Sequence, residues 1–337
     1  MNNPAIPGSV EGVAIYAALG FAGMAIGAVL AALLYFGGRR WIDACPPAAR
    51  QRWLTALLLC PVIAALALML SMSAPISLFS GNDLLAHCSA HPETHGALCQ
   101  WHAPQIALPA WLTLTVLLLL GSVLLAGGYK IARLIAAKRR LRLMQHLADE
   151  QPDGRYFLLP MSEPLAFAAG LFRGHTYISK GLKRQLDESS LAIVLAHEDA
   201  HVRRHDMLAT ALINSLSRLH IPMIGKALRQ TWQLAAEQSC DASVAKQTGD
   251  RLAVADCLIC VARLQNQHRR EMKISACHLI DSQLDARISA LLNSPAPRGP
   301  APAFSLLGVF SVALAALTLA GPTVHHWMEH LLPATGL

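Results

Sequence analysis

The chain contains the stretch Leu195-Ala-His-Glu-Asp-Ala-His-Val-Arg-Arg-His-Asp206, which follows an apolar helical lead-in. Residues i and i+4 of a helix lie on one face, so His197 and His201 can direct two imidazoles at one metal ion. Glu198 stands beside them, where its carboxylate can take a proton from a water at that ion. Since zinc accepts imidazole and carboxylate ligands, the pattern predicts a Zn²⁺ site with Glu198 as catalytic base.

A catalytic zinc site needs a third protein ligand and keeps one position open. His205 lies two helical turns, about 12 Å along the axis, from His197, so three rings cannot readily converge on one ion. The better candidate is Glu237, on the next predicted helix.

Two further carboxylates are candidates to support the ligands. Asp241 is the i+4 neighbour of Glu237 and can accept a hydrogen bond from the far nitrogen of a liganding imidazole. Asp206 follows His201 by five residues and is placed in the same supporting role. No basic residue separates Glu237 from Asp241, which favours a metal site over a solvated helix face.

The composition indicates a membrane protein. Of the 337 residues, 54% are hydrophobic and only 15% are charged, whereas a soluble domain carries about 25% charged residues. A membrane-spanning helix needs about 20 apolar residues. Four segments meet this length, and the sequence therefore predicts an α-helical membrane protein with four transmembrane helices, at about residues 13–37, 54–72, 106–129 and 304–323.

The basic residues predict the orientation. Residues 1–38, 53–129 and 299–337 contain no Lys or Arg, and loops rich in these residues stay in the cytosol. Both termini and the loop 73–105 are therefore expected outside, and residues 130–303 in the cytosol. The net charge of +7 is explained by this topology and by attraction to anionic lipids, without direct nucleic-acid binding.

Three parts of the chain are expected. Residues 1–149 form a membrane domain with three helices, residues 150–294 a cytosolic catalytic domain, and residues 295–337 a Pro-rich linker with the fourth helix. In the catalytic domain we expect short strands followed by helices. The strands are expected at about 156–160, 165–168 and 175–179. A first helix, capped by Asp187 or Ser189, is expected to run through His201. A second helix is expected from about Lys226 to Lys246 and is stopped by Gly249.

Several of these motifs together resemble the BlaR/MecR family of regulatory, antibiotic-sensing membrane metallopeptidases. They are Gly170-Leu-Phe-Arg-Gly174, Ile178-Ser179, Leu195–Asp206, Glu237-Gln-Ser-Cys-Asp241 and Arg287-Ile-Ser-Ala-Leu-Leu292. The resemblance implies an α+β, gluzincin-like fold for the cytosolic domain. It also implies zinc ligation by His197, His201 and Glu237, with Glu198 as the base.

The resemblance further implies a multi-pass protein of the bacterial inner (plasma) membrane that cleaves a cytosolic transcriptional repressor after an outside signal. The expected partners are the lipid bilayer and a cytosolic protein substrate, a winged-helix repressor in this interpretation, with a homodimer left open. The substrate is expected to enter as an extended strand beside Leu165–Ala168.

The chain departs from the family pattern in two places. The antibiotic sensors carry a penicillin-binding domain after the last span, whereas about a dozen residues follow it here and none form Ser-x-x-Lys. Direct β-lactam sensing is therefore not expected. Asp199 stands where the family tends to have an apolar residue, and on a helix it is expected to face away from the metal.

The predicted outward loop is dense in histidine and cysteine. Its candidate sensor residues are His87, Cys88, His91, His95, Cys99 and His102. The two cysteines could form a structural disulfide in an oxidising compartment, or the group could bind a soft or borderline metal. Elsewhere, Cys257-x-x-Cys260 lacks a second such pair and is interpreted as part of the core, and Gly23-x-x-x-Gly27 would allow close helix packing.

Two other functions remain open at this stage. A housekeeping membrane protease, similar to the HtpX or CAAX-processing types, would use the same chemistry on many substrates. A non-catalytic transmembrane receptor would hold a structural metal. Glu198 argues against the receptor, because a structural zinc site needs no base and is usually closed.

Overall fold

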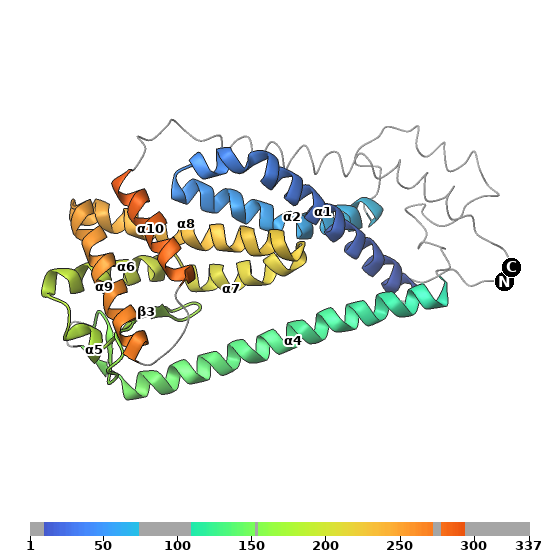
Figure 1. Cartoon of the computed structure of the whole chain (residues 1–337). Coiled ribbons are helices and arrows are strands. Elements are labelled where there is room, and N and C mark those ends of the chain that lie inside the picture. Colours follow the sequence, from blue (N-terminus) through green and yellow to red (C-terminus); the bar gives the residue numbers. More distant parts are fainter. Residues whose placement is uncertain (1–9, 74–108, 152–153, 272–277, 294–337) are drawn as a thin grey trace, which may run out of the picture.

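The computed structural model describes residues 10–73, 109–151, 154–271 and 278–293. The predicted outward loop, the Pro-rich linker and the fourth span lie outside the described residues. Within them the protein is mostly helical, with one small sheet (Figure 1). Three helices are long and apolar enough to cross a membrane: α1, Val10–Ala44; α2, Pro47–Ser73; and α4, Ala110–Leu147.

Helices α1 and α2 form a tightly packed antiparallel pair. A Cβ at Gly23 would lie 2.6 Å from the Cα of Ala65, and a Cβ at Gly27 would lie 2.6 Å from the carbonyl oxygen of Cys60. The glycine pair therefore allows the close backbone approach that its spacing suggests. Arg50 closes the turn between the helices, because its guanidinium donates to the carbonyl of Asp43 at 2.7 Å.

Helix α4 is longer than a membrane span. It has 38 residues, about 57 Å at 1.5 Å per residue, and is exposed along most of its length. Its C-terminal end contacts the sheet, where Gln145 donates to the hydroxyl of Tyr177 at 2.7 Å. The segment after the third span is thus one continuous helix with it.

The sheet has the strand order β1-β2-β4-β3. Its strands are β1, Asp149–Glu150; β2, Phe157–Leu159; β3, Ala166–Ala169; and β4, His175–Ser179. Strands β3 and β4 pair antiparallel, whereas β2 and β4 pair parallel. Strands β2, β3 and β4 confirm the three expected strands. The sequence pattern did not reveal β1, which contributes only two residues.

Helices follow the sheet to the end of the described chain. They are α5, Lys180–Lys183; α6, Glu188–Arg203; α7, Asp206–Leu216; the 3₁₀ turn η2, Ser217–Leu219; α8, Pro222–Thr248; α9, Arg251–Glu271; and α10, His278–Leu292. Asp187 caps α6 by accepting from the N–H of Ser190 at 3.2 Å. Gly249, at φ 73°, ends α8 in the left-handed region, where glycine carries no Cβ penalty.

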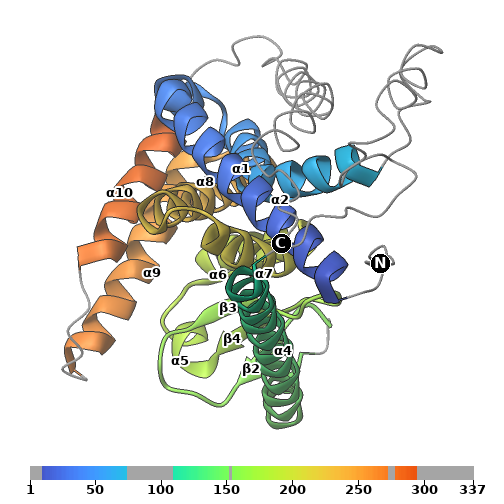
Figure 2. The same ribbon diagram turned by 90° about the vertical axis from the view of Figure 1, so that its right-hand side faces the viewer.

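The helices that follow the sheet pack directly on the α1–α2 pair. Figure 2 shows α6 and α7 between the sheet and the α1–α2 pair. One core cluster joins α1 and α2 to α7 and α8. Its members from α1 and α2 include Tyr35, Leu54 and Leu58, and those from α7 and α8 include Ile213 and Trp232. The first two helices therefore form part of the core under the site.

The α1–α2 contact yields a stability prediction. Gly27→Ala should destabilise the protein by about 1–3 kcal/mol, because the added methyl overpacks the interface. Gly37→Ala is the matched control on the same helix, since nothing lies within 4 Å of its added Cβ. The control should be neutral or slightly stabilising, as Ala is the better helix former. Thermal unfolding of both variants in one detergent checks this, and equal midpoints would contradict it.

Candidate active site

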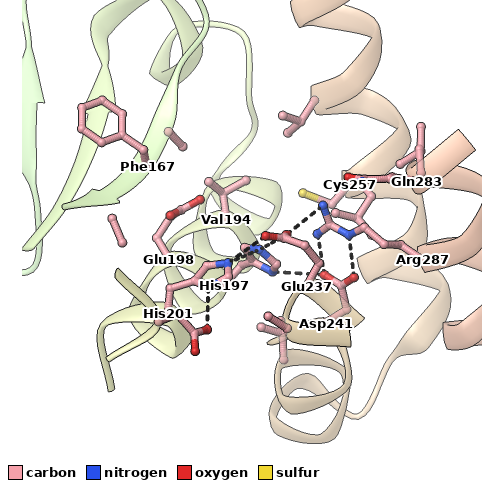
Figure 3. A pocket seen from close by; sticks show the side chains of 18 of the residues that line it. Phe167, Val194, His197, Glu198, His201, Glu237, Asp241, Cys257, Gln283 and Arg287 are labelled. Carbon is pink, nitrogen blue, oxygen red and sulfur yellow. Dashed lines mark hydrogen bonds and ion pairs between the residues drawn. The ribbon is translucent and has the colours of Figure 1, made fainter. Parts of the chain in front are cut away.

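Helices α6 and α8 bring three predicted ligands together. His197 and His201 lie one turn apart on α6, and their Nε2 atoms are 3.2 Å apart. Glu237 of α8 reaches both rings, with 3.4 Å from Oε2 to Nε2 of His197 and 3.6 Å from Oε1 to Nε2 of His201. One imidazole or carboxylate atom from each residue thus lies within 4.8 Å of the others. The arrangement can hold a metal ion, and Figure 3 shows how the side chains converge.

Each imidazole is held from behind by its own carboxylate. Nδ1 of His197 is 3.1 Å from Oδ1 of Asp241, and Nδ1 of His201 is 2.8 Å from Oδ2 of Asp206. A carboxylate at Nδ1 favours the tautomer with its proton there, which leaves the Nε2 lone pair for a metal. Asp241 and Asp206 therefore lie where the supporting role was predicted for them.

A break after α6 places Asp206. His205 adopts φ 54° and ψ 35°, a left-handed conformation that is uncommon outside glycine, and it precedes the first residue of α7. This turn ends the helix and brings the buried Asp206 back onto His201. His205 itself is exposed and does not line the cavity at the site. Its exclusion as a ligand on helical spacing agrees with this position.

Glu198 and Asp199 point to different surroundings. Glu198 lines the cavity, and its carboxylate accepts a hydrogen bond from the backbone N–H of Ala168 in β3. Burial raises the pKa of Glu198, while the positive charges of His197 and His201 act against that rise. Asp199 instead accepts from the hydroxyl of Thr176 in β4 at 3.0 Å. It does not line the cavity, as the helical geometry predicted.

The ionisation of the cluster reflects its mutual hydrogen bonds. Burial lowers the pKa of both histidines, but the neighbouring carboxylates outweigh it and raise the pKa to about 9 for His197 and about 12 for His201. Burial raises the pKa of Glu237, yet the histidines and Arg287 hold it well below its usual value. Because a metal ligand must be an unprotonated imidazole, metal binding at this site releases protons.

Arg287 of α10 was not predicted to belong to the site. Its Nε and Nη2 donate to the two oxygens of Asp241 at 2.8 and 2.7 Å, and its Nη1 lies 3.1 Å from Oε2 of Glu237. No basic residue lies between the two acidic residues on α8, but Arg287 of α10 pairs with both of them. Their partner comes from 46 residues further along the chain, a separation that no local pattern encodes. The only sequence signal was its position in a motif that carried the family resemblance.

The cluster opens into a cavity of about 610 Å³. Strand β3 forms one wall, with Ala166, Phe167 and Ala168. This strand is at one edge of the sheet, so its outer side has no strand partner among the described residues. Cys257 of α9 lines the opposite side and is buried, which agrees with its interpretation as a core residue. An extended peptide could therefore lie between β3 and the helices.

The chain belongs to the BlaR1 peptidase M56 family. The family model matches residues 20–291, well over half of the chain. The match covers most of α1, all of α2 and α4, the sheet and the cluster on α6 and α8, and it confirms the resemblance found in the sequence. Together with three apolar helices, it indicates a membrane protein with a metallopeptidase domain.

Curated relatives match over shorter stretches. The "Protease HtpX homolog" of Aquifex aeolicus is 35% identical over 68 residues, which is 20% of this chain and 22% of the relative. The homologue of Bordetella pertussis is 33% identical over 91 residues, 26% of this chain and 31% of the relative. The homologue of Acidiphilium cryptum is 33% identical over 100 residues, which is 28% of this chain and 35% of the relative. The chain thus spans between 22% and 35% of the length of these relatives. No solved structure matches.

The contacts of Arg287 yield a second prediction. Arg287→Gln should destabilise the protein by about 3–5 kcal/mol, because it removes the cationic partner of the buried Asp241 carboxylate. Arg203→Gln is the matched control, since Arg203 is exposed at the end of α6. Its effect should stay within about 0.5 kcal/mol. Thermal unfolding in detergent measures both, and a stable Arg287→Gln protein would show that the ion pair is not needed for the fold.

Proposed function

We propose that the chain is a membrane zinc endopeptidase that cleaves cytosolic protein substrates. In this proposal His197, His201 and Glu237 are the zinc ligands, and Glu198 is the catalytic base. The convergence of these four side chains in one cavity is the observation that carries the proposal.

The spacing of the donor atoms fits zinc. Tetrahedral zinc with bonds of about 2.0–2.2 Å requires ligand atoms about 3.3–3.6 Å apart. The three separations in the cluster are 3.2, 3.4 and 3.6 Å. Two imidazoles and one carboxylate also form the ligand set of a catalytic zinc site, with a fourth position left open. A bound zinc ion would supply a Lewis acid that polarises the scissile carbonyl.

The protein's own residues supply the remaining steps. Glu198 can take a proton from the attacking water and later give it to the leaving amine. Its burial makes the carboxylate a stronger base, while the N–H of Ala168 holds it in place. Asp206 and Asp241 keep the two imidazoles oriented. A substrate in extended conformation would pair with the open edge of β3, as strand addition commonly does.

The substrate separates two versions of this proposal. The regulatory version is cleavage of one transcriptional repressor in response to an outside signal, and the family match favours it. The housekeeping version is proteolysis of many proteins, and the HtpX relatives favour it to the same degree. A receptor with a structural metal is disfavoured, because Glu198 lines the cavity and is not one of the three converging ligands.

The chemistry yields a prediction about Glu198. Glu198→Gln should keep bound zinc but lose proteolysis by about 10²–10⁴-fold, because the general base is gone while all three ligands remain. His197→Ala is the contrasting variant and should lose zinc as well. Metal content by mass spectrometry and new protein termini in a cell extract treated with purified protein provide the two measurements.

The same experiment distinguishes the two versions. New termini in a single DNA-binding protein support the regulatory version, whereas new termini in many proteins support the housekeeping one. In either case the new termini should be absent when the Glu198→Gln variant is used. If the termini persist in this variant, Glu198 is not the base. If zinc stays bound after His197→Ala, the ligand set is wrong.

We also propose that the catalytic domain faces the cytosol and that residues 73–105 face outward. The asymmetry of Lys and Arg along the chain supports this. In a protein with Cys88 and Cys99 replaced by serine, Asn82→Cys should react with an impermeant maleimide on intact cells. Lys246→Cys, exposed on α8, should react only after lysis. The opposite labelling pattern would reverse the topology.

A further inference from the structure

The segment from Asp206 to Ala236 folds back on itself along α2. It comprises α7, η2 and the first half of α8, and is called the hairpin here. Gly225 allows the fold, because a Cβ there would lie 2.0 Å from the carbonyl oxygen of Ser217. Figure 1 shows the hairpin pointing away from α6 and along the α1–α2 pair. It therefore extends from the site toward the part of α2 that crosses the membrane.

Hydrogen bonds to α2 fix how far the hairpin reaches. Arg52 is the last basic residue before the uncharged apolar run of α2. Trp232 donates from Nε1 to the hydroxyl of Thr55 at 2.9 Å, and His220 donates from Nε2 to the carbonyl of Leu58 at 3.3 Å. Leu58 lies six residues beyond Arg52, about 9 Å along the helix. The turn of the hairpin thus lies beside the apolar part of a membrane span.

The turn presents apolar side chains on its outer surface as well. Leu216 and Ile224 are buried in the cluster shared with α2. On the other side, Leu219 is 37%, Ile221 49% and Met223 81% exposed. Contiguous apolar groups of this kind mark a surface for a membrane or a partner.

The charges around the turn favour lipid as the occupant. Residues 207–236 contain no Asp or Glu, and their charged residues are Arg218, Lys226 and Arg229. Arg218 is near enough to interact with Lys130 of α4, the first basic residue after the third span. Arg218 therefore stands at the level where α4 leaves its apolar run. Basic residues at this level meet anionic head groups.

We propose that the turn of the hairpin, residues 219–223, inserts into the acyl chains of the leaflet next to the catalytic domain. Arg218, Lys226 and Arg229 then contact the lipid phosphates. The hairpin enters and leaves on the same side, so it anchors the catalytic domain without crossing the bilayer. Trp232 bonds to Thr55 and also lines the cavity, which places one wall of the site at the level of the head groups.

Fluorescence quenching in lipid nanodiscs tests the insertion. An environment-sensitive fluorescent amino acid replaces Met223 in the full-length protein, in nanodiscs of phosphatidylethanolamine and phosphatidylglycerol. Leu252 is the matched control, an apolar side chain 65% exposed at the start of α9. Lipids brominated on their acyl chains should remove most of the fluorescence at position 223 and leave position 252 unchanged. Aqueous iodide should quench the fluorescence at position 252 and leave that at position 223 unchanged.

Two results would overturn the proposal. Quenching by iodide at position 223 as strong as at position 252 would place the turn in water. No quenching at position 223 by either agent would mean that protein, such as a second copy of the chain, covers it. If the probe at position 223 prevents folding, the same measurement at Leu219 decides. The readout needs no proteolysis, so it stands apart from the test of the proposed function.

Discussion

The fully buried carboxylate of Asp241 is the constraint on which the arrangement of the site depends. An unpaired charge cannot be buried without a large cost, so Asp241 must be surrounded by partners. One partner is Nδ1 of His197 on α6, and the other is the guanidinium of Arg287 on α10. Three helices are therefore held at fixed distances by one side chain. Glu237 lies one turn before Asp241 on α8, so the same contacts direct it at the two imidazoles.

The features that sequence predicted well are those encoded locally. The i, i+4 pair on α6 needs only helical periodicity, and the cap at Asp187 and the stop at Gly249 are single-residue signals. The strands near the site were likewise visible as short runs between turn residues. Glu237 was found because its neighbour Asp241 on the same helix made a pattern. The second helix begins at Pro222, four residues before the expected start at Lys226, since proline is well tolerated in a first turn.

The features that sequence missed depend on contacts between distant segments. Nothing near Arg287 in the chain indicates that it meets two carboxylates of α8, because the pairing arises only when α10 packs there. The left-handed turn at His205 was also unforeseen, since it is stabilised by the contact that Asp206 makes afterwards. The packing of α7 and α8 on α2 was hidden for another reason. Their apolar residues would suit the core of a soluble domain as well as packing against a membrane helix. Contacts in the structure, such as the hydrogen bond from Trp232 to Thr55, distinguish these two arrangements.

The place of Arg287 in the chain has a consequence for biosynthesis. The residues of the cluster on α6 and α8 are all synthesised before the helix that supplies their cation. Until the ribosome has released α10, Asp241 has no guanidinium partner, and the cost of burying its charge opposes closure of the cluster. The site therefore gains its contacts with Arg287 only late in the synthesis of the described chain.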